Sequence, residues 1–68
     1  MDLKGIKSTL LEIQRADGDD AKQHELEDKL LWDFVTYISE KEHYTIELKV
    51  MANEILKSKN IEFSRWYD

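Results

Sequence analysis

The sequence predicts an all-α domain of three helices, with consecutive helices antiparallel and an aromatic C-terminal tail packed back on them. Apolar residues recur at helical spacing in three separate stretches, which is typical of helices that bury one face. The 68 residues include two glycines and no proline, so few positions interrupt a helix. At this length we expect residues 1–68 to form a single domain.

The first helix is predicted over residues 2–15. Its apolar residues recur three or four positions apart: Leu3, Ile6, Leu10 and Ile13. Leu11 is expected to widen this buried stripe. Gly5 disfavours a helix by about 1 kcal/mol relative to alanine, so we expect the first turn to be frayed. The polar residues around Gly18 then predict a loop.

The second helix is predicted from an N-cap at Asp19 or Asp20 to about Ser39. A short carboxylate accepts hydrogen bonds from the free N–H groups at a helix start. Seven apolar or aromatic residues fall within one half of this helix: Leu26, Leu30, Leu31, Phe34, Val35, Tyr37 and Ile38. This is the strongest amphipathic pattern in the chain. Trp32 falls outside that half, and a polar connection over residues 40–43 follows.

Residues 44–50 fit either a strand or a helix. The strand is indicated by apolar residues that alternate with polar ones: Tyr44, Ile46, Leu48 and Val50. A helical apolar face, however, continues from Leu48 to Leu56. We predict a helix with Thr45 as its N-cap and an end near Lys59, because a lone strand would have no pairing partner. This helix leaves Ile46 and Val50 on the face opposite to the core.

The C-terminal residues 61–68 contain four large apolar or aromatic side chains: Ile61, Phe63, Trp66 and Tyr67. Leaving them in water would be costly, so we expect the tail to fold back on the helices. Phe63 and Trp66 are expected in the core.

This stretch resembles the end of small bacterial and phage-associated proteins in which a helix precedes an Ile/Asp-Phe-x-Arg-Trp type of tail. The matching residues are Ala52, Ile55, Leu56, Ile61, Phe63, Arg65 and Trp66. The resemblance implies a helical fold and a phage or bacterial origin, and it implies nothing about chemistry.

Composition excludes several classes of function. Fifteen acidic and ten basic residues give a net charge of -5, which disfavours direct binding of nucleic acid. We find no apolar run of about 18 residues and no signal-peptide pattern, so we expect a cytoplasmic protein that does not contact a membrane. The chain has no cysteine, and disulfides and zinc–thiolate sites are therefore excluded.

No pattern in the sequence predicts an enzyme. The chain lacks a glycine-rich phosphate loop, and no spacing sets a hydroxyl beside an imidazole that a third group orients. Asp20, His24 and Asp28 lie one helical turn apart and offer one alternative, a divalent metal site for hydrolysis. Two carboxylates beside a surface histidine are common in an acidic helix, so we expect no catalytic, cofactor or metal site.

Acidic residues concentrate between Glu12 and Asp33, where eight carboxylates accompany three basic side chains. Such a surface would attract a basic partner. Trp32, which has carboxylates around it, has the composition of a binding hot spot, unless the first helix or the tail covers it. The predicted interaction residues are Asp17, Asp19, Asp20, Asp28, Trp32 and Asp33.

The sequence therefore predicts a non-enzymatic protein-interaction module, phage-encoded if the resemblance holds, that binds or inhibits a host protein through an acidic helical face. One alternative is a structural homodimer in which Ile46 and Val50 pair. Another is an acidic mimic of DNA that blocks a nucleic-acid-binding protein. In the simplest alternative the acidic surface only keeps the domain soluble.

Overall fold

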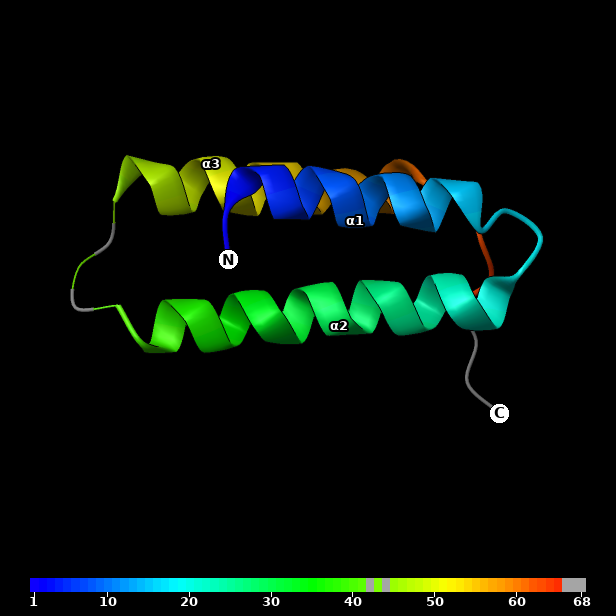
Figure 1. Cartoon of the computed structure of the whole chain (residues 1–68), viewed down its shortest axis with the longest axis horizontal. Helices are drawn as coiled ribbons and strands as arrows, with labels where there is room; N and C mark the ends of the chain where they lie inside the picture. The colour runs from blue at the N-terminus through cyan, green and yellow to red at the C-terminus, as the bar shows by residue number, and fades with distance from the viewer. Residues whose placement is uncertain (42, 44, 66–68) are drawn as a thin grey trace.

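The computed structural model describes residues 1–41, 43 and 45–65. Its elements are α1 (Leu3–Arg15), α2 (Asp20–Ser39), α3 (Ile46–Leu56) and a 3₁₀ turn, η1 (Lys57–Asn60). α2 runs antiparallel to α1 and α3, which lie side by side along it (Figure 1). The described residues form no strand, and the predicted all-α fold is confirmed. None of the helices in this part of the chain is long and apolar enough to span a bilayer.

Side-chain caps mark the starts of α2 and α3, as predicted. Oδ1 of Asp19 accepts a hydrogen bond from the backbone N–H of Lys22 at 3.1 Å, and Oγ1 of Thr45 accepts one from Leu48 at 3.3 Å. These bonds satisfy N–H groups that have no partner within the helix. Residues 46–50 are helical, so the strand alternative is wrong there, and Tyr44 lies outside the described residues.

Two expectations about helix ends are wrong. Asp2 caps α1 through a 2.7 Å hydrogen bond that its Oδ1 accepts from Gly5. The glycine therefore lies in an ordered first turn instead of a frayed one. The third α-helix ends at Leu56, not at Lys59, because the chain tightens into the 3₁₀ turn η1, a frequent ending of α-helices.

The core lies where one face of each helix meets the other two. Its buried apolar residues are Ile6, Leu10, Ile13, Leu30, Leu48, Met51 and Ile55. Ile61 and Phe63 of the tail pack against this cluster, and the predicted return of the tail is confirmed for them. Trp66, which was also expected in the core, lies outside the described residues.

The structure leaves four residues exposed that the helical pattern assigned to the core. The exposed fractions are 43% for Leu11, 43% for Leu31, 56% for Val35 and 56% for Leu56. All four lie at the edge of an apolar face, and in a three-helix domain each helix has neighbours on only part of its circumference. The apolar stripe that the sequence predicts covers half of the helix circumference, and the stripe that the structure buries is therefore narrower.

Gln23 is the reverse case, a polar residue that the structure buries. Its side chain is 1% exposed, and its Nε2 donates a 2.9 Å hydrogen bond to the backbone carbonyl of Ile13. The bond joins the first turn of α2 to the end of α1. It thereby supports the tight connection between these two helices.

Met51 and Val50 offer a direct test of the core, since they are adjacent and differ in burial. Met51 is 0% exposed and Val50 is 44% exposed. Met51→Ala is expected to lower the free energy of unfolding by about 2–5 kcal/mol, because it leaves a cavity. Val50→Ala should cost less than about 1 kcal/mol. Urea denaturation measures both changes, and equal losses would contradict this core.

Candidate interaction surface

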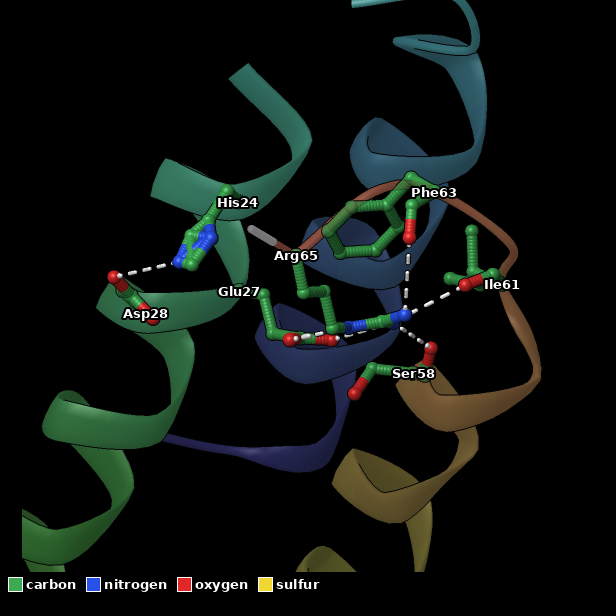
Figure 2. A network of polar contacts seen from close by, with 7 residues as sticks. All are labelled: His24, Glu27, Asp28, Ser58, Ile61, Phe63 and Arg65. Atoms are coloured by element: carbon green, nitrogen blue, oxygen red, sulfur yellow. Dashed lines mark hydrogen bonds and ion pairs between the residues drawn. The ribbon is translucent and has the colours of Figure 1, made fainter. Parts of the chain in front are cut away.

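Arg65 joins the C-terminal tail to α2. Its Nε and Nη2 donate hydrogen bonds to Oε1 and Oε2 of Glu27 at 2.9 and 3.0 Å. Nη2 also donates to the backbone carbonyls of Ser58 and Ile61, at 3.0 and 3.1 Å (Figure 2). A single guanidinium thus connects α2, η1 and the tail, and the two-point contact with Glu27 fixes its orientation.

The ring of Phe63 adds a second contact to this network. The guanidinium carbon of Arg65 lies 3.7 Å from the centre of the ring (Figure 2), close enough for a cation–π interaction. Because Phe63 also packs on the core, the network holds the tail over the end of the domain where α2 begins (Figure 1).

The charge of Glu27 belongs to this network. Burial alone would raise the pKa of Glu27, but hydrogen bonds from Arg65 and Ser58 and the positive charge of Arg65 outweigh it, so the pKa lies below its usual value. The hydrogen bond with Glu27 in turn raises the pKa of Arg65. Glu27 therefore stabilises the fold and adds little to the acidic surface.

The other carboxylates of α2 do not share one face either. Asp33 pairs with Lys29, and the distance from its Oδ2 to the lysine Nζ is 2.8 Å. Oδ2 of Asp28 lies 3.5 Å from Nε2 of His24 (Figure 2). Asp28 and Asp33 are five positions apart, which corresponds to about 140° around the helix. The single negative face expected from the sequence is therefore divided.

The three aspartates of the α1–α2 connection lie far from Trp32. Asp19 caps α2, and Asp17 and Asp20 are exposed beside it. Asp20 and Trp32 are twelve positions apart in α2, a distance of about 18 Å along the helix axis. The structure therefore does not bring these aspartates and the tryptophan into one contact site.

The metal-site alternative finds no support in the described residues. Among them, no group of three or more histidine, aspartate or glutamate side chains could hold a metal ion. His24 lies close to Asp28, one helical turn away, but its side chain is only 15% exposed, so the expectation of a surface histidine is wrong.

Trp32 lies on the outside of α2, and no described part of the first helix or the tail covers it. Its side chain is 71% exposed. Leu31 and Val35 are also exposed. Val35 is three positions from Trp32 and four from Leu31, so the three side chains are neighbours on the helix surface. We call these three residues the α2 ridge. Glu25 and Asp28 lie one to two turns before it.

Sequence reasoning identified Trp32 but missed the other two ridge residues and the role of Arg65. Leu31 and Val35 lie at the margin of the apolar half of α2, and this position was the one feature of the sequence that could have indicated their exposure. Arg65 and Glu27 are 38 positions apart, so no local spacing relates them.

Comparison of the chain with protein-family models, with curated proteins and with solved structures gives no match in any of the three. The resemblance of the C-terminal stretch to bacterial and phage-associated proteins stays a prediction. The chemistry of the surface therefore carries the functional argument.

The contact between Arg65 and Glu27 can be measured by a double-mutant cycle. Arg65→Ala and Glu27→Ala are each expected to lower the free energy of unfolding by about 1–3 kcal/mol, because each leaves a partly buried charge unpaired. The double variant should lose less than the sum of the two. The exposed pair of Lys29 and Asp33 supplies the control, since Lys29→Ala should leave the free energy of unfolding nearly unchanged. Strict additivity would show that the two side chains do not interact.

Acidification should weaken the same contact. The pKa of Glu27 is lower in the folded protein than in the unfolded chain, so its stabilisation is complete above about pH 4.5 and is lost as the pH falls through the folded value. The wild type should thus lose more stability between pH 7 and pH 3 than Glu27→Gln does. Urea denaturation at both pH values gives the comparison, and equal losses would refute this role of Glu27.

Proposed function

We propose that this protein is a non-enzymatic interaction module that binds another protein through the α2 ridge. The observation that carries the proposal is the 71% exposure of Trp32 beside the exposed Leu31 and Val35. Tryptophan is enriched at binding hot spots, since one side chain buries a large area at small entropic cost. Isolated exposed apolar residues are ordinary, but adjacent ones on one helix face favour a contact surface.

Charge indicates the kind of partner. Glu25 and Asp28 lie on the ridge side of α2, and the chain carries a net charge of -5. A partner segment that combines apolar side chains with lysine or arginine would match both features. The long-range attraction would mainly speed association, whereas the tryptophan would supply most of the affinity.

The chemistry of the ridge supports binding over catalysis. An indole and two aliphatic side chains offer no nucleophile and no general acid or base. The DNA-mimic alternative has less support, because Glu27 turns inward to Arg65 and Asp28 and Asp33 face different sides of α2. Duplex DNA instead presents charge regularly, about every 1.7 Å along its axis.

Affinity capture from a bacterial lysate tests the proposal. The variant Glu25→Lys/Trp32→Ala alters the ridge and its charge. The amount of each specific partner that this variant captures should be at least about tenfold lower than for the wild type, because truncation of a hot-spot residue weakens the binding free energy by about 2 kcal/mol or more. Equal recovery of every partner by the wild type and by this variant would refute the proposal.

A matched control places the same kinds of change on α1. The variant Leu11→Ala/Glu12→Lys removes an exposed leucine and reverses a neighbouring charge. It should retain the partners of the wild type. Circular dichroism should show the wild-type helix content in both variants, since all four positions are exposed.

A further inference from the structure

α3 carries a second exposed apolar surface, on the side away from the core. Ile46 is 82% exposed and Val50, one turn later, is 44% exposed. Asn53 and Lys57 continue the same stripe at spacings of three and four, and both are exposed. We call these four residues the α3 face. Its first half is apolar, and its second half is polar and ends in a cation.

The exposed side of α2 also has an apolar half and a polar half, but there the apolar half is nearer the C-terminal end of the helix. From the C-terminal end, Val35 and Leu31 are apolar, and Asp28 and Glu25 are acidic. The spacing from Val35 to Leu31 equals that from Ile46 to Val50. The two surfaces therefore match in an antiparallel alignment, with apolar residues against apolar ones and acidic residues near the basic end.

We infer that the α2 ridge of one copy binds the α3 face of a second copy of this chain, with the two helices antiparallel. The inference rests on the proposed function, in which the ridge is the docking surface, and it names a partner for that surface. Val35 opposes Ile46 of the second copy. Leu31 and Trp32 oppose its Val50.

The charged ends stay in register over this length. With Val35 set against Ile46, Glu25 lies about 15 Å along α2, and Lys57 lies about 16 Å along the opposing helix. Their side chains can form an ion pair at this separation. Lys57 already contacts Glu54 at 2.7 Å, but its ammonium has three donors, so the contact within the chain and the contact between copies are compatible.

A contact between two unlike surfaces closes a ring where the rotation between copies allows it, and otherwise it continues into a chain. Association should therefore reach the dimer or a larger assembly. It should also be weak, because one helix face per copy buries little area.

Analytical ultracentrifugation of the full chain, from about 1 µM to about 1 mM, tests this arrangement. The mean mass of the wild type should rise above that of the monomer as the concentration increases. Val35→Glu blocks the ridge and Ile46→Glu blocks the α3 face. Each places a carboxylate at an exposed position, so the fold is kept, and each variant alone should stay monomeric.

An equimolar mixture of the two variants gives the decisive result. One variant keeps an intact α3 face and the other an intact ridge, so the mixture should form a 1:1 dimer and nothing larger. Ser8→Glu adds the same charge at an exposed position of α1 and should behave as the wild type.

Three results would overturn the inference. They are a monomeric wild type at every concentration, a monomeric mixture, and a wild-type dimer that Ile46→Glu abolishes but Val35→Glu leaves intact. The last would show symmetric pairing of α3 faces. A monomeric wild type whose other partners are lost with Glu25→Lys/Trp32→Ala would refute self-association alone, and the proposed function would stand.

Discussion

The contact between Arg65 and Glu27 holds the C-terminal segment in place. The guanidinium bonds a carboxylate of α2 and two backbone carbonyls that follow α3. Ile61 and Phe63 lie between these anchor points and pack on the core. A chain of this length buries a small core, so each apolar side chain that the tail contributes matters. One ion pair thereby makes a short terminal segment part of the domain.

The same arrangement explains why an apolar surface remains outside. Leu30 is 3% exposed, whereas the adjacent Leu31 and Trp32 are 43% and 71% exposed. The difference is one of direction around α2, because two neighbouring helices and a tail cover only part of its circumference. Leu31, Trp32 and Val35 lie on the uncovered part, and this part supplies the surface on which the proposed function rests.

The acidic residues show how the fold assigns different tasks to one kind of side chain. Asp19 caps a helix, Glu27 anchors the tail, and Asp28 pairs with a histidine on the same helix. A count of carboxylates predicts the net charge but not the direction of the field. What remains for recognition beside the ridge is Glu25 and Asp28, a smaller acidic surface than the sequence suggested.

The sequence by itself determined the three helices, the caps at Asp19 and Thr45, and the exposure of Ile46 and Val50. These features depend on residues within one or two turns, where spacing and capping chemistry decide the outcome. Only the tertiary structure decided that Gln23 is buried, that Leu31 and Val35 are exposed, and that Arg65 meets Glu27 across 38 positions. Each of these depends on which neighbours cover a helix, and no local pattern carries that information.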